Sequence, residues 1–152
     1  MQTGNASQWD LADTLEGIVS LAWMTFVGSE IVRIDPTNPE SDVVCASIAI
    51  SGPNSATVLF FAGPALARWG TASVLGMEPD EPTDGDVHDV MGELVNIIGG
   101  NLKGLVSDDG DWSLTLPVVS NAMQSAPGGR LVSQVAFLAE GGTIGCNILE
   151  HG

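Results

Sequence analysis

Hydrophobic positions recur along the chain with either a helical or an extended period. From Asp10 to about Val27, apolar residues follow the three- and four-residue spacing of an amphipathic helix, and Ser7 precedes this segment as a candidate cap. Residues 86–106 continue the same period over a longer stretch. Pro64 opens a shorter helical segment, residues 64–77, because proline is favoured in the first turn of a helix. The pattern therefore predicts three helices.

Most of the remaining apolar residues form short runs rich in β-branched side chains, which predict strands at residues 43–52, 55–63, 112–119, 129–141 and 143–150. Turn residues separate the first two runs, and Gly141 and Gly142 separate the last two, so each pair predicts a hairpin. Turns or loops are expected at residues 35–42, 78–86 and 107–111. This order of elements predicts a single α+β domain, residues 1–152, with a largely antiparallel sheet covered by helices.

The segment 86–106 has an unusual polar side. At 100° per residue its apolar positions fill one broad arc that is expected to face the core: Val90, Met91, Leu94, Val95, Ile97, Ile98, Leu102, Leu105 and Val106. The opposite arc contains Asp89, Glu93, Asn96 and Lys103, with Gly92, Gly99, Gly100 and Gly104 beside or between them. Each glycine weakens a helix interior by about 0.5–1 kcal/mol relative to alanine. We therefore expect the glycines to let another protein approach closely.

One further polar residue of this segment, Asn101, projects toward the apolar arc, where its amide needs a hydrogen-bonding partner.

The charge of the chain limits its partners. Nineteen acidic against four basic side chains give a net charge of −15, which repels both nucleic acid and anionic membrane surfaces. The first 28 residues lack the basic start of an export signal, and acids interrupt their apolar run. These features predict a cytoplasmic protein that binds neither nucleic acid nor membrane.

Cysteine and histidine residues give no sign of a metal site. Cys45 and Cys146 lie in apolar, strand-like runs, which favours reduced, buried thiols. His88 and His151 are far apart in the sequence, and neither has a second ligand at close spacing. Nucleophile-and-base and phosphate-binding loop motifs are also missing from the sequence, which disfavours a small-molecule hydrolase.

The polar arc carries a specific motif. Asp89, Glu93 and Asn96 follow the spacing D-x-x-x-E-x-x-N, and Pro117 comes after a further twenty residues. This arrangement resembles the signature of the CheC/CheX/FliY chemotaxis phosphatases. The Asn96 to Pro117 interval is shorter than in the family pattern, which a short turn at residues 107–111 would explain. Residues 8–27 contain no second E-x-x-N motif, so the resemblance within the family is to the single-site CheX type.

The resemblance implies a CheC-like fold and an aspartyl-phosphate phosphatase that acts on a CheY-like response regulator in chemotaxis or two-component signalling. It implies that Asn96 positions the attacking water and that Glu93 anchors the partner through a lysine. Asp89 is a marker of the motif, and its charge favours the positive helix N-terminus. The phosphatase needs no cofactor of its own, since Mg²⁺ belongs to the partner's site. CheX-like proteins are dimers, so a homodimer is expected. The alternative is a non-catalytic interaction module of the same fold that docks onto receiver domains.

Overall fold

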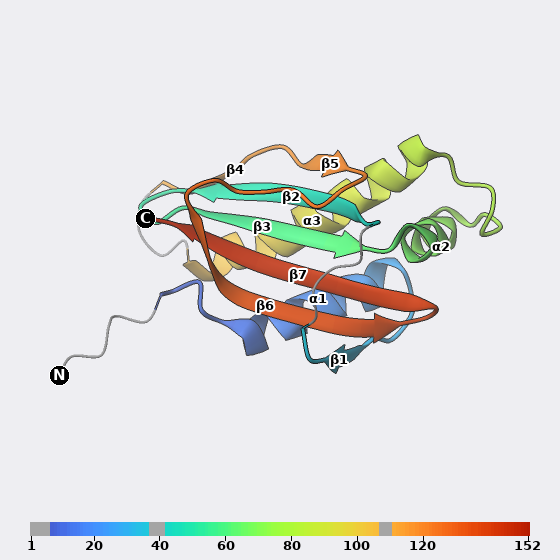
Figure 1. Cartoon of the computed structure of the whole chain (residues 1–152), viewed down its shortest axis with the longest axis horizontal. Helices are drawn as coiled ribbons and strands as arrows, with labels where there is room; N and C mark the ends of the chain where they lie inside the picture. Colours follow the sequence, from blue (N-terminus) through green and yellow to red (C-terminus); the bar gives the residue numbers. More distant parts are fainter. Residues whose placement is uncertain (1–6, 37–41, 107–110) are drawn as a thin grey trace.

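The computed structural model describes residues 7–36, 42–106 and 111–152, and these form one antiparallel sheet with helices on one face (Figure 1). The elements in chain order are α1 (Ala12–Phe26), β1 (Val32–Ile34), β2 (Val44–Ser51), β3 (Ala56–Ala62), α2 (Pro64–Leu75), α3 (Asp84–Val106), β4 (Ser113–Leu114), β5 (Val118–Ser120), β6 (Gly129–Ala139) and β7 (Gly142–His151). The strand order is β1-β6-β7-β3-β2, and β4 and β5 both pair with β2 at the edge. The predicted α+β class and antiparallel sheet are confirmed.

Local sequence signals explain where several elements begin and end. α2 has Pro64 in its first turn and ends at Gly76, whose φ of 68° is the left-handed conformation that glycine adopts without strain. The predicted hairpins are confirmed as β2–β3 and β6–β7. α3 begins at Asp84, two residues earlier than the predicted start at 86, because Thr83 and Asp86 bond each other's backbone N–H in a capping box.

Two predictions about local structure are wrong, and one strand was not predicted. Ser7 does not cap the first helix: the N-cap is Leu11, which has no side-chain cap, and the Ser7 hydroxyl instead accepts from the Trp9 N–H and donates to Glu150. The predicted strand 112–119 is two short strands, β4 and β5, because Pro117 between them has no N–H to donate to a ladder. β1 is an additional strand that is too short and too exposed to show a clear pattern.

Two predicted turns fall partly or wholly beyond the described residues. Of the turn at 35–42, residues 37–41 lie outside them, as do residues 107–110 of the turn at 107–111.

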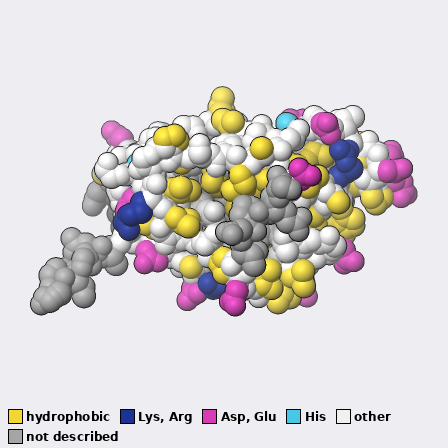
Figure 2. Space-filling view, in the orientation of Figure 1, with side chains coloured by type: hydrophobic (Ala, Val, Ile, Leu, Met, Phe, Trp, Pro, Cys, Tyr) yellow, Lys and Arg dark blue, Asp and Glu magenta, His cyan; other side chains and the backbone are white. Residues whose placement is uncertain are grey.

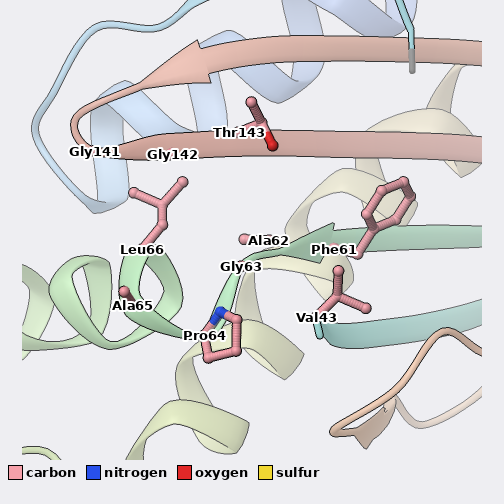
Figure 3. A pocket seen from close by; sticks show the side chains of 10 residues that line it. All are labelled: Val43, Phe61, Ala62, Gly63, Pro64, Ala65, Leu66, Gly141, Gly142 and Thr143. Carbon is pink, nitrogen blue, oxygen red and sulfur yellow. The ribbon is translucent and has the colours of Figure 1, made fainter. Parts of the chain in front are cut away.

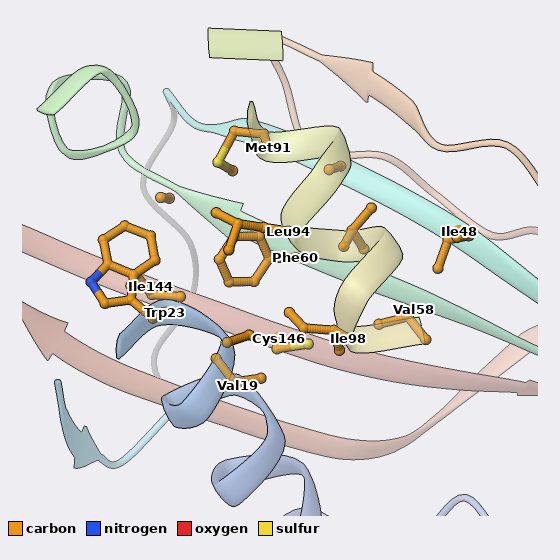
Figure 4. Packing of buried hydrophobic residues seen from close by; sticks show 14 of the residues in the cluster. Val19, Trp23, Ile48, Val58, Phe60, Met91, Leu94, Ile98, Ile144 and Cys146 are labelled. Carbon is orange, nitrogen blue, oxygen red and sulfur yellow. The ribbon is translucent and has the colours of Figure 1, made fainter. Parts of the chain in front are cut away.

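The main core lies between the helices and the sheet (Figure 4). α1 contributes Val19 and Trp23, and α3 contributes Met91, Leu94 and Ile98, all of them buried. They pack against the apolar side chains that β2, β3 and β7 direct to this face, including Ile48, Val58, Phe60, Ile144 and Cys146. The apolar arc predicted for α3 is therefore its core face, except that Leu105 in the last turn is 54% exposed.

None of the helices in the described part of the chain covers the opposite face of the sheet. This face carries a smaller cluster of Val43, Cys45, Leu59 and Phe61. Figure 2 shows hydrophobic side chains gathered across this face. Cys45 belongs to this cluster and Cys146 to the main core, and both are buried and free, as predicted for thiols within strands. Burial raises the pKa of both thiols above their ordinary value, most strongly for Cys146.

Candidate functional site

α3 presents an exposed line of residues to solvent, here called the α3 ridge: Asp89, Glu93, Asn96, Gly100 and Gly104. Glu93 is exposed and Asn96 is half-buried, one helical turn further along. Among the side-chain hydrogen bonds that the described residues make, none involves Asn96, whereas Asn101 on the same helix is engaged. The ridge thus places a carboxylate and an uncommitted carboxamide side by side on a rigid element.

The four glycines predicted on the polar side of α3 fall into two structural classes, which corrects the expectation that all of them serve access. Gly92 and Gly99 are buried. A Cβ on Gly92 would lie 3.5 Å from both Pro117 Cβ and Val119 Cγ2, and one on Gly99 would lie 2.8 Å from Ile48 Cγ2. Gly99 lets α3 pack closely against β2, whereas a Cβ on Gly92 would make ordinary contact with Pro117 and Val119. Gly100 and Gly104 are exposed, and a Cβ on either would meet no neighbouring atom within 4 Å.

Pro117 lies beside α3, because its Cβ is one of the atoms nearest to Gly92. Gly92 immediately precedes Glu93, so the fold places Pro117, the last residue of the motif, beside the helical turn that carries Glu93. Pro117 is half-buried and its neighbour Leu116 is 86% exposed. The segment between β4 and β5 therefore forms one flank of the α3 ridge.

Two other polar residues of α3 differ from expectation. Asn101 does not project into the core: it is exposed, and its Nδ2 donates to the Ile97 carbonyl at 2.9 Å, which satisfies the amide within its own helix. Asp89 lies beyond the first turn of a helix that begins at Asp84, so Asp84 and Asp86 are the acids at the positive helix end.

The electrostatic character of the ridge is acidic, through Asp89 and Glu93. The ion pairs in the described part of the chain join Arg33 to Asp13 and Glu16, Arg68 to Asp84 and Arg130 to Glu150, so Glu93 is in none of them. An unpaired, exposed carboxylate favours a cationic group on a partner.

A pocket elsewhere offers no comparable chemistry. Figure 3 shows a cavity of about 170 Å³ where β3 leads into α2 and the turn between β6 and β7 closes over it. Its lining contains no charged side chain and none of the ridge residues. Over the three described ranges, no cluster of three or more histidine, cysteine or acidic residues could hold a metal ion, and no helix has the length and apolarity needed to cross a bilayer.

Several solved structures share this fold. CheX from Vibrio vulnificus superposes with a TM-score of 0.78 at 17% sequence identity, covering 98% of this chain and 100% of that one. A chain of the CheX-CheY-BeF3-Mg²⁺ complex from Borrelia burgdorferi gives 0.79 at 19% identity, covering 95% and 100%. A CheC-like superfamily protein from Shewanella sp. PV-4 gives 0.72 at 21% identity, covering 96% and 100%. These similarities define the class of fold, which is CheC-like, as predicted.

The family follows from the sequence itself. Residues 44–128 match the family model described as chemotaxis phosphatase CheX. This span is more than half of the chain and includes all of α3, with Glu93 and Asn96, as well as Pro117. The chain therefore belongs to the chemotaxis phosphatase CheX family, and the predicted enzyme class, a phosphatase, is confirmed. A comparison with curated protein sequences finds no match.

Proposed function

We propose that this chain hydrolyses the aspartyl phosphate of a CheY-like response regulator, with Asn96 positioning the attacking water and Glu93 anchoring the partner. The observation that carries the proposal is the placement of both side chains one turn apart on the α3 ridge, within the span that matches the family. The Borrelia burgdorferi relative, solved as a complex with CheY, BeF3 and Mg²⁺, supports the choice of substrate.

Asn96 suits the chemical step because a carboxamide donates through Nδ2 and accepts through Oδ1. Held against the phosphoryl group, the amide orients a water for in-line attack on phosphorus. The new bond joins the water oxygen to phosphorus, the bond between phosphorus and the aspartyl oxygen breaks, and inorganic phosphate and a free carboxylate are released. The divalent cation that offsets charge in this step belongs to the receiver. This chain contributes the orientation of the water.

Glu93 suits anchoring rather than chemistry, because a carboxylate is repelled by a phosphoryl group and attracted by an ammonium group. It is exposed and pairs with no cation among the described residues. Three residues of α-helix rise about 4.5 Å along the axis. When a lysine of the receiver binds Glu93, the Asn96 amide is therefore held at a fixed distance from that lysine.

The test separates binding from chemistry. Against a CheY-like receiver that the parent protein dephosphorylates, Asn96→Ala should lower kcat by roughly 10- to 1000-fold and leave KM nearly unchanged, as expected for loss of a transition-state hydrogen bond. Asn54→Ala is the matched control, because this amide lies in the turn between β2 and β3 and bonds Glu150, and its kcat should stay within about twofold of the parent value.

For the anchor, Glu93→Ala should weaken association with the receiver. The loss should shrink when the partner's lysine is also neutralised, as in a double-mutant cycle. Glu140→Ala, an exposed acid in the turn between β6 and β7, controls for general charge. If Asn96→Ala dephosphorylates as fast as the parent, the ridge is a docking surface and the chain is a non-catalytic interaction module.

We also propose that the chain forms a homodimer through its sheet. β1 is a three-residue edge strand, and Val32 in it and its partner Leu138 in β6 are 65% and 54% exposed. Unprotected apolar edges favour strand pairing between copies. Static light scattering at tens of micromolar should give a dimer mass, and a monomer mass would contradict the proposal.

A further inference from the structure

An open groove of about 460 Å³ lies on the surface between α1 and α3. Its α1 side includes Gly17, Ile18, Leu21 and Phe26, and its α3 side consists of Ile97 and Asn101. We call this surface the α1–α3 groove. Its lining is mostly apolar, and Leu21 at its margin is 67% exposed. Asp13 also borders the groove and is paired with Arg33.

Gly17 has no packing reason to be glycine. It lies in the middle of α1, where glycine weakens a helix by about 0.5–1 kcal/mol relative to alanine. Among the described residues, no atom lies within 4 Å of where a Cβ on Gly17 would be. Leu21 follows it one turn later, on the same side of the helix. A gap followed by a prominent apolar side chain is a shape that another molecule can fill.

The groove is continuous with the α3 ridge. Ile97 and Asn101 line the groove, and each immediately follows a ridge residue, Asn96 or Gly100. A protein partner of ordinary size covers roughly 800 Å² on each side, a patch roughly 30 Å across. A contact patch of that size around Asn96 extends onto the adjoining groove residues Ile97 and Asn101.

We propose that the α1–α3 groove is the apolar anchor site for the phosphorylated receiver, taking up aliphatic or aromatic side chains of that domain. The inference rests on the function proposed above and assigns catalysis and binding to different helices. α3 supplies the acid and amide that act at the phosphoryl site, and α1 supplies the apolar contact that sets affinity. Well-packed apolar anchors beside a polar rim carry most of the affinity in such interfaces.

The first test is Leu21→Gln, which removes the apolar contact, adds no charge and keeps a good helix former. KM for the phosphorylated receiver should rise at least about tenfold with kcat within about twofold of the parent value, and Kd for the receiver activated with BeF3⁻ and Mg²⁺ should weaken by the same factor. Leu131→Gln is the matched control: Leu131 is 48% exposed and pairs with Leu149, which packs on the helix-free face of the sheet. Its KM should not change.

A second variant, Gly17→Leu, fills the groove from within. Because the space is open and leucine favours helix, this variant should fold at least as stably as the parent while raising KM in the same way. If Leu21→Gln fails to fold, Gly17→Leu still tests whether the groove binds the receiver.

The outcomes separate the two proposals. If both groove variants keep the parent KM and Kd while Asn96→Ala still loses kcat, the groove inference fails and the proposed function stands. If Asn96→Ala is fully active, the proposed function fails. If Leu21→Gln turns a dimer into a monomer without changing Kd for the receiver, the groove seats a second copy of this chain and the inference is overturned. An equal loss in Leu131→Gln would overturn it as well.

Discussion

Two adjacent glycines of α3 offer a direct test of how this helix is used. A Cβ on Gly99 would lie 2.8 Å from Ile48 Cγ2, a branch atom on a side chain that is 1% exposed and has little freedom to turn away. A Cβ on Gly100 would lie in open space on the α3 ridge, one turn beyond Asn96. The same substitution, glycine to alanine, should therefore have opposite effects on stability at these neighbouring positions.

The magnitudes follow from the environment of each Cβ. Alanine at an exposed helix interior gains about 0.5–1 kcal/mol over glycine, and each kcal/mol moves Tm by about 2–4 °C in a domain of this size. Gly100→Ala should raise Tm by about 1–4 °C. For Gly99→Ala, the overpacking cost of about 1–3 kcal/mol exceeds that gain, so Tm should fall. Thermal unfolding followed by circular dichroism measures both.

Activity should vary in the reverse sense at Gly100. If this position gives clearance to a receiver that reaches Asn96, the added methyl group holds the partner away, and kcat/KM should fall about tenfold or more although the protein is more stable. A drop in Tm for Gly100→Ala would show that a Cβ at this position does not project into open space. A higher Tm with unchanged kcat/KM would refute the role of Gly100 in partner access while leaving the packing argument intact.

Three other predictions concern stability and reactivity. Glu150 accepts hydrogen bonds from Ser7 and Asn54 and pairs with Arg130, which lowers its pKa below the ordinary value of about 4.5. Its contribution to stability is therefore complete above pH 4.5 and is lost as the pH falls through the lowered pKa, so Glu150→Gln should reduce Tm at neutral pH and the gap should narrow in acid. Cys45 and Cys146, buried and with raised pKa, should react with a thiol reagent far more slowly in the native protein than in guanidinium, and equal rates would contradict this. Gly145→Ala should lower Tm by several degrees, since its Cβ would overlap the Phe61 ring, and an unchanged Tm would show that the ring moves freely.

Much of the fold could be predicted because its strongest signals are local. The apolar period of α3 identified the side that faces the sheet, and Pro64 marked the first turn of α2. Leu105 broke the pattern because it lies in the last turn before α3 ends at Val106, where periodicity cannot show that the core has ended. The Ser7 cap failed for a tertiary reason, since the hydroxyl is engaged with Glu150, distant in the sequence.

The candidate site could be predicted only in part. A helical period shows which side of the helix a residue lies on, but it does not show which other segments pack over that side. Spacing placed Glu93 and Asn96 on one side of α3, and both are accessible there. It could not show that Gly92, a neighbour on the same side, is buried under the segment between β4 and β5. That cover comes from residues some twenty-five positions later, and no pattern within α3 indicates it.

This cover also suggests why a proline accompanies an acid and an amide in the motif. Pro117 lies against Gly92, which places the β4–β5 segment beside the helix that carries Glu93 and Asn96. Asn96, on the next turn of the same helix, is half-buried rather than fully exposed. In the proposed function, a half-buried amide has less conformational entropy to lose when it orients the water than an amide on an open helix. Gly99 lets α3 pack closely against β2, and the exposed Gly100 and Gly104 leave the α3 ridge open to the partner proposed for it.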